Sequence, residues 1–360
     1  MKKQLKTEDK TVLFAAANSG KGFTSFYSQI FGGGDIKRRY LIKGGPGTGK
    51  STFMRRAAER AEGKGLSVEY YRCSSDPASL DAIVIEGRTA IIDATSPHSL
   101  ECEIAGARDE IIDLGRFWDS EGLCGAREEI ELLSAAKSDA YRGAYRLLSA
   151  ALSLERRNTD LIAPYVDRDK MLKAAERIAK NIPGGKGYRL SVGLRESLGM
   201  KGRVSVDTYE KSAKKLYIIK DDHRVGDIFL AMLASLAVSK GNAIRVSYSP
   251  IDTERLDALL FEESGYAFVL EQDDSGNGGK IINMRRFIKH EELLGEKGKR
   301  VKSEYKANHR VYEGLLQSAS DLLSYAGEYH FELENIYKRY MDFEALEGFT
   351  SSFLDTVVKK

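Results

Sequence analysis

The sequence predicts a mixed α/β fold made of two tandem three-layer units, each with a helical appendage. Three observations lead to this prediction: a glycine-rich loop between a β-prone run and a helix, a long helical stretch, and an internal repeat. The chain has 360 residues, which is long for one domain and comfortable for two.

The glycine-rich loop is the most specific motif in the chain. Gly44-Gly45-Pro46-Gly47-Thr48-Gly49-Lys50-Ser51 fits the pattern G-x-x-x-x-G-K-[ST]. The β-prone run Arg39 to Lys43 precedes it, and an Ala- and Arg-rich helix, Ser51 to Glu62, follows it. A strand before and a helix after are the context in which this pattern binds phosphate. We therefore expect a P-loop.

Each part of the motif has a role in binding a nucleotide. Glycines let consecutive N–H groups turn toward an anion, Lys50 reaches the β- and γ-phosphates, and the Ser51 hydroxyl coordinates Mg²⁺. Asp93 ends the apolar run Ala90 to Asp93 and is the expected acidic residue on the other side of the metal. The predicted cofactors are ATP and Mg²⁺, because no guanine-reading N/T-K-x-D motif is evident. The predicted nucleotide-binding residues are Gly44, Gly45, Pro46, Gly47, Thr48, Gly49, Lys50, Ser51 and Thr52, with Lys50 and Asp93 as catalytic residues and Ser51 and Asp93 as metal ligands.

The catalytic base is not identified by the sequence. Ala94 follows Asp93 where many ATP-hydrolysing P-loop proteins have a water-orienting Glu. The remaining candidates are Asp76, His98 and Glu101. Asp76-Pro77 is also expected to cap a short helix, Ala78 to Ala82. Two arginines, Arg88 and Arg116, are interpreted as structural.

The second half of the chain repeats the first. Tyr40 to Lys43 matches Tyr217 to Lys220, and Leu80 to Ala82 matches Leu256 to Ala258, with collinear matches about 170 to 180 residues apart. The predicted domains are residues 1–185, with a helical part at about 100–180, and residues 186–360, with a helical C-terminal part. In the second copy the loop reads Lys220 to Ile228, and Asp and Ile replace the motif's Lys and Ser. Its carboxylates would repel phosphate, so this copy is predicted to be degenerate.

Composition narrows the class of protein. Lys and Arg total 56 against 53 Asp and Glu, a net charge of +3, which makes nucleic acid an unlikely partner. Three cysteines without CxxC spacing argue against disulfides and zinc. Residues 1–10 do not resemble a signal peptide, and no apolar run reaches the roughly 18 residues of a membrane span. A cytoplasmic location is therefore expected.

The chain resembles the uncharacterised tandem P-loop ATPase-like proteins of Gram-positive, spore-forming bacteria. The segments that carry the resemblance are Lys21 to Phe23, Leu41 to Thr52, residues 70–81, residues 90–98 and Ile112 to Trp118. The resemblance implies two P-loop NTPase domains with helical appendages. It implies no reaction or substrate.

Three functions fit these observations. The leading one is a Mg-ATP-binding protein that hydrolyses ATP slowly and uses the nucleotide state as a conformational or partner-regulating switch. The alternatives are a small-molecule or nucleotide kinase with a helical lid and a nucleic-acid-dependent ATPase. The sequence leaves open the phosphoryl acceptor, the partner and the oligomeric state.

Overall fold

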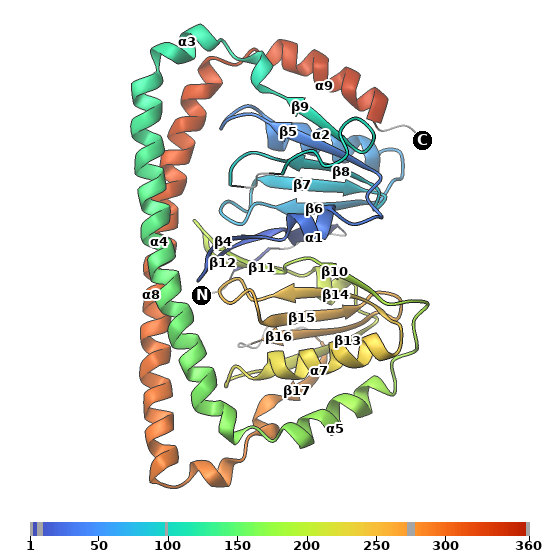
Figure 1. Cartoon of the computed structure of the whole chain (residues 1–360), viewed down its shortest axis with the longest axis vertical. Coiled ribbons are helices and arrows are strands. Elements are labelled where there is room, and N and C mark those ends of the chain that lie inside the picture. The colour runs from blue at the N-terminus through green and yellow to red at the C-terminus, as the bar shows by residue number, and fades with distance from the viewer. Residues whose placement is uncertain (1–2, 6–9, 98–99, 272–277, 358–360) are drawn as a thin grey trace.

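The computed structural model describes residues 3–5, 10–97, 100–271 and 278–357 of the chain. Two six-stranded sheets lie one above the other, and two long helices run along one side of both (Figure 1). The mixed α/β class predicted from the sequence is confirmed.

The first sheet has five parallel strands and one antiparallel strand. Its order is β2 (Thr11–Phe14), β6 (Val68–Arg72), β7 (Leu80–Ile85), β8 (Thr89–Asp93), β5 (Arg38–Lys43) and β9 (Asp109–Asp113). The exception is β7, which is antiparallel to both neighbours. The inner strands are apolar and buried on both faces, as expected for a sheet covered on both sides. Helix α2 (Lys50–Glu62) packs on this sheet, and we call the sheet with α2 the first core.

The second sheet repeats this topology. Its order is β10 (Arg189–Val192), β14 (Ala243–Tyr248), β15 (Leu256–Phe261), β16 (Tyr266–Glu271), β13 (Lys215–Lys220) and β17 (Lys280–Asn283). The register irregularity at Tyr71/Arg72 in the first sheet recurs at Ser247/Tyr248 in the second. Helix α7 (Gly226–Ser239) packs on this sheet, and together they form the second core. The internal repeat is therefore present as two sheets with the same strand order.

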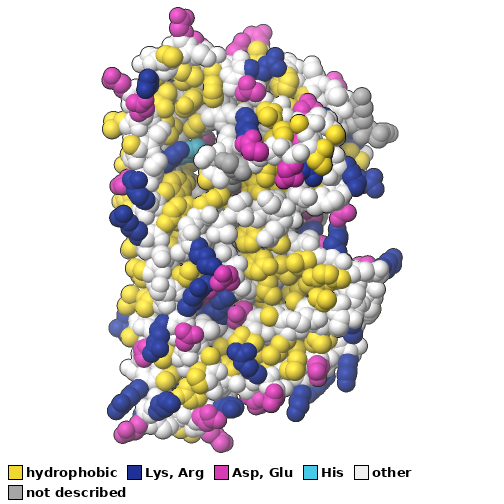
Figure 2. Space-filling model, in the orientation of Figure 1, with side chains coloured by type: hydrophobic (Ala, Val, Ile, Leu, Met, Phe, Trp, Pro, Cys, Tyr) yellow, Lys and Arg dark blue, Asp and Glu magenta, His cyan; other side chains and the backbone are white. Residues whose placement is uncertain are grey.

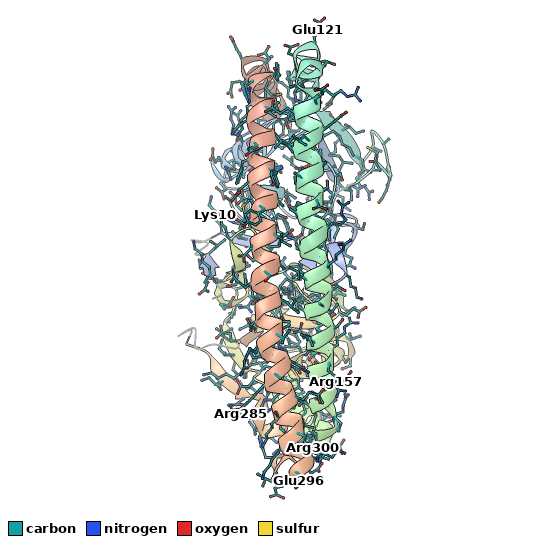
Figure 3. The ribbon with its side chains drawn as sticks, turned by 90° about the vertical axis from the view of Figure 1, so that its left-hand side faces the viewer. Lys10, Glu121, Arg157, Arg285, Glu296 and Arg300 are labelled. Atoms are coloured by element: carbon teal, nitrogen blue, oxygen red, sulfur yellow. The ribbon has the colours of Figure 1, made fainter. Side chains whose placement is uncertain are left out.

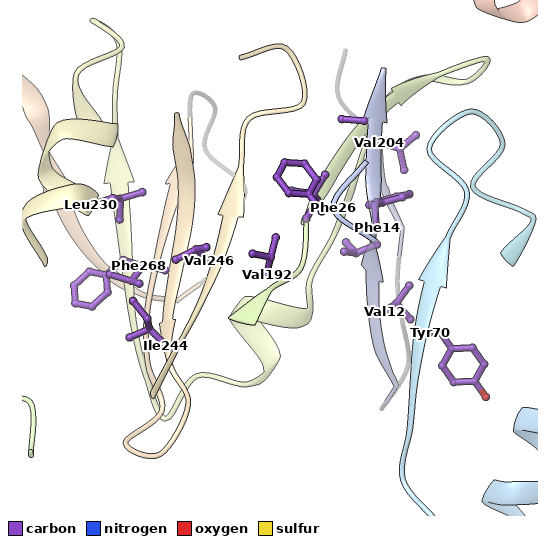
Figure 4. Close-up of a cluster of buried hydrophobic side chains, with 14 of the residues drawn as sticks. Val12, Phe14, Phe26, Tyr70, Val192, Val204, Leu230, Ile244, Val246 and Phe268 are labelled. Carbon is purple, nitrogen blue, oxygen red and sulfur yellow. The ribbon is translucent and has the colours of Figure 1, made fainter. Parts of the chain in front are cut away.

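The two cores meet through hairpins and a shared apolar cluster. The hairpins are β3 (Ala16–Ser19) with β4 (Gly22–Ser25) and β11 (Glu196–Gly199) with β12 (Gly202–Val206), with β1 (Lys3–Leu5) beside β12. Short helices follow each hairpin, α1 (Tyr27–Phe31) and α6 (Thr208–Lys211). Val12, Phe14, Val192 and Val204 belong to one buried cluster across the junction (Figure 4). The hydroxyl of Thr208 donates to the Val12 carbonyl and accepts from its N–H.

The helices that follow each sheet are exchanged between the cores. After η1 (Gly115–Phe117) and α3 (Ser120–Gly125), helix α4 (Arg127–Ile162) leads through η2 (Ala163–Tyr165) to α5 (Arg168–Ala179), which packs on α7 of the second core. After η3 (Met284–Phe287) and η4 (His290–Leu293), helix α8 (Glu296–Arg339) returns and α9 (Phe343–Val357) packs on α2 of the first core. Helices α4 and α8 lie side by side and antiparallel along the molecule (Figure 3). The predicted boundary at residue 185 falls between α5 and β10.

Two local predictions were wrong. Residues 109–113, expected to be helical, form the edge strand β9, in which Ile111 is exposed and Ile112 is buried. Pairing with β5, and the salt bridge from Asp109 to the fully buried Arg39, override the helical pattern. Residues 78–82 form a turn and the start of β7, so Asp76 caps no helix there.

Among the described residues, no helix combines the length and apolar character that a bilayer crossing needs. The three cysteines are free thiols.

The exchange predicts that α9 holds the first core together. Phe353 packs against Tyr40 and Phe53, with ring centroids 4.9 and 5.1 Å away. We expect Phe353→Ala to lower the free energy of unfolding by about 3 kcal/mol, because it leaves a cavity in a shared core. Phe343→Ala, on the exposed face of the same helix, should change it by less than about 0.5 kcal/mol. Equal effects in urea unfolding would contradict this assignment.

Candidate phosphate-binding site

The loop between β5 and α2 has the backbone that its glycines allow. Gly47 and Gly49 have φ angles of 69° and 83°, in the left-handed region that favours glycine. The Thr48 hydroxyl donates to the Gly45 carbonyl at 2.9 Å and closes the turn. Gly49 is the N-cap of α2, and no side chain caps this helix end. The first N–H groups of α2 and its dipole are therefore available to an anion.

Lys50 and Asp93 come together because their strands are neighbours. Strands β5 and β8 pair in parallel, so the loop and Asp93 leave the sheet at the same edge. The Lys50 Nζ donates to the carbonyl oxygens of Gly44 and Gly45 at 2.9 and 2.8 Å and lies 3.7 Å from Asp93 Oδ2. Asp93 is further held by the Thr95 N–H at 3.0 Å. The predicted pair thus lies within one site.

Ser51 lies in the first turn of α2, next to Lys50. Its Oγ accepts a hydrogen bond from the N–H of Leu80 at 3.1 Å, at the start of β7. The Ser51 hydroxyl can still donate its own proton to another acceptor. No group of three or more His, Cys, Asp or Glu suited to a metal is found in the described part of the chain. Mg²⁺ at a nucleotide usually takes only one or two protein ligands beside phosphate and water oxygens, so Ser51 and Asp93 fit that chemistry.

Helix α4 carries a second lysine, Lys137, close enough to Lys50 for the two positive charges to repel. Lys137 is partly buried, and among the described residues no hydrogen bond or ion pair engages it. Burial, and then the positive charge of Lys50, lower the pKa of Lys137. Two ammonium groups that repel one another are stabilised by an anion between them. No local sequence pattern indicates Lys137, because nothing in the sequence of α4 shows which face of the helix meets the loop.

The outer side of the loop lies against segments from far along the chain. A Cβ atom at Gly45 would lie 3.2 Å from the rings of both Trp118 and Tyr337, and one at Gly47 would lie 2.5 Å from the Glu334 carbonyl oxygen. Tyr337 and Glu334 belong to α8, which follows the second core. Glycine is therefore required at 47 both by its φ angle and by the close approach of α8. Trp118 forms part of the wall of this loop.

The candidates for a catalytic base and the two arginines lie at separate positions in the fold. Asp76 accepts from the Ala78 N–H and pairs with Lys201 at 3.2 Å, and Glu101 is exposed and pairs with Lys43 at 3.0 Å. Arg88 lies in the β7–β8 turn, at the sheet edge opposite the loop. Arg116 stacks over Phe117 and Phe349, as Arg286 does over Phe287, which agrees with a packing role. His98 lies outside the described residues.

The equivalent loop of the second core is filled by its own carboxylate. Asp221, 5% exposed, accepts hydrogen bonds from the N–H groups of Val225 and Gly226 at 2.9 and 2.8 Å, at the start of α7. Asp227, at the position of the motif's lysine, pairs with Arg255 at 2.7 Å. The start of α7 is therefore already occupied by an internal carboxylate, which would oppose a second anion there. Burial raises the pKa of Asp221.

No family model, curated protein or solved structure matches this chain. The resemblance to tandem P-loop ATPase-like proteins therefore stays a prediction.

The geometry predicts that Lys137 serves an anion and not the fold. We expect Lys137→Met to leave urea stability unchanged or slightly higher, because it removes a partly buried cation that Lys50 repels. The same change should weaken ATP binding by about fivefold, the worth of one partly screened charge. Wild-type stability should also rise with pH just below 10.5, where the unfolded state holds the Lys137 proton more tightly, and this rise should be absent in the variant. A destabilised Lys137→Met protein with normal ATP affinity would contradict the prediction.

Proposed function

We propose that the protein binds Mg-ATP at residues 44–52 and hydrolyses it slowly, acting as a conformational or partner-regulating switch. The main support is the convergence of an uncapped helix N-terminus, Lys50 and Asp93 at one sheet edge. The positive charge of Lys137, which Lys50 repels, adds to this support. In this proposal the start of α2 and both lysines bind the phosphates, while Ser51 and Asp93 hold Mg²⁺. The metal would neutralise charge on the transferred phosphoryl group.

The proposal that the protein acts as a switch rests on the contact between the loop and α8. Its outer side is packed against α8, so a change of loop conformation on nucleotide binding must move either the loop's own glycines or α8. The absence of a Glu after Asp93 favours slow turnover. Ala94, which stands there, is buried and carries no group able to orient water.

A small-molecule kinase is the second candidate, favoured by one observation. Asp81, only 4% exposed, follows Leu80, whose N–H donates to the Ser51 hydroxyl. In a kinase, this buried carboxylate would be the candidate base that accepts a proton from an acceptor hydroxyl. A nucleic-acid-dependent ATPase is less favoured. On the face in Figure 2, basic and acidic side chains are interspersed without a continuous basic stripe.

Turnover of radiolabelled ATP tests the first proposal against the second. We expect wild-type protein with Mg²⁺ to release inorganic phosphate at a rate indifferent to a pool of small-molecule acceptors. Lys50→Ala should lower that rate by about 100-fold or more, because a positioned charge on the developing anion is lost. Lys306→Ala, at an exposed position on α8, is the matched control and should leave it unchanged. Transfer of label to an acceptor would establish the kinase instead, and equal rates in wild type and Lys50→Ala would refute both.

The filled second loop predicts one nucleotide per chain. Titration calorimetry of wild-type protein with Mg-ATP should give a stoichiometry of about one, and Lys50→Ala should bind none at the same concentrations. A stoichiometry near two would mean that a phosphate displaces Asp221 from the N–H groups of Val225 and Gly226. That result would contradict the interpretation of the second core.

A further inference from the structure

A cavity of about 770 Å³ opens beside the second core. It lies at the carboxyl ends of β13 and β16, where Asp222 and Glu271 line it, and α8 closes it with Tyr305 and His309. Helix α4 contributes Glu155. The carboxyl edge of parallel strands is where α/β sheets bind ligands, and the volume is in the range of small-molecule sites.

Buried groups in the cavity wall lack hydrogen-bond partners within the described part of the chain. They are Oε2 of Glu155, Nη2 of Arg224 and Nε of Arg195, on side chains from residues 3, 9 and 2% exposed. The other atoms of these groups are engaged, since Arg224 pairs with Glu155 and Arg195 with Glu196 and Glu210. Buried polar atoms normally have a partner. One acceptor and two donors thus remain for a ligand that carries both kinds of group.

The charge of the wall indicates the sign of that ligand. Eight carboxylates line the cavity against four guanidinium groups. The anion position of the core is already filled by Asp221, so a phosphate has no free helix end here. Tyr305 and His309 stack on one another along α8 and line one side of the cavity. The cavity wall therefore favours a ligand with positive charge and repels a purely anionic one.

We propose that this cavity is a binding site for a small cationic amino compound, one that carries ammonium groups together with an oxygen acceptor. The ammonium groups face Glu155 and the excess carboxylates, and the acceptor takes the free donors of Arg195 and Arg224. The site is independent of the nucleotide site, since no residue of the loop at 44–51 lines it.

Titration calorimetry with three probes of similar chain length tests the proposal on the full chain. L-lysine has both kinds of group, cadaverine lacks the carboxylate, and glutarate lacks the ammonium groups. We expect saturable binding of L-lysine, weaker binding of cadaverine and none of glutarate. The Lys50→Ala protein should give the same result, which separates this site from the proposed nucleotide function. No saturable binding of either amine, cadaverine binding at least as tightly as L-lysine, or binding of glutarate would overturn the proposal.

Variants at the cavity mouth locate the binding without disturbing its buried pairs. Gln317 and Glu313 line the cavity yet are exposed on α8. Gln317→Arg and Glu313→Gln should each weaken L-lysine binding by about fivefold, as expected for one partly screened charge, whereas Gln317→Glu should not weaken it. Glu328→Gln, the same change at an exposed site further along α8, is the control. Binding that all these variants leave unchanged would place the amine elsewhere and refute the assignment.

Discussion

The antiparallel packing of α4 against α8 is the interaction on which the rest of the structure depends. The seam is formed by small and large side chains in alternation, Ala144, Leu148 and Ala151 facing Tyr312, Leu316 and Ala319. It is tight enough that a Cβ at Gly143 would lie 2.9 Å from Leu322. Because each long helix continues into the terminal helix of the opposite core, neither core is closed by its own segment. The two cores therefore share their apolar burial, and we expect them to unfold together.

The same helix pair also completes both sites. Helix α8, which follows the second core, forms the wall of the loop in the first core through Glu334 and Tyr337. Helix α4, which follows the first core, brings Glu155 to the second core, where it pairs with Arg224. A packed helix moves as a stiff body and not by bending locally. A displacement of α8 at the loop would therefore be felt near Tyr305 and His309, about seven turns earlier in the helix.

The sequence predicted those features that are encoded locally. The loop, its flanking strand and helix, and Asp93 at the end of β8 depend on short patterns, and the repeat depends on collinear matches. Strand β9 was missed because Ile111, Ile112 and Leu114 fit a helical period as well as an edge strand. Lys137 and the exchange of α5 and α9 were missed for a different reason. They depend on the direction in which long helices leave the cores, which no local pattern specifies.

The two cores show how one topology supports different chemistry at the same edge. In the first, glycines at 47 and 49 turn the backbone around an open helix end, and Lys50 adds charge. In the second, Arg224 holds a positive φ of 53° and Asp221 occupies the helix end, so the turn persists while its anion is supplied from within. Replacing a bound anion by a covalently attached carboxylate removes the cost of recruiting one from solution. The second core can thus keep its fold without a nucleotide, and its carboxyl edge is left to the cavity that α4 and α8 close.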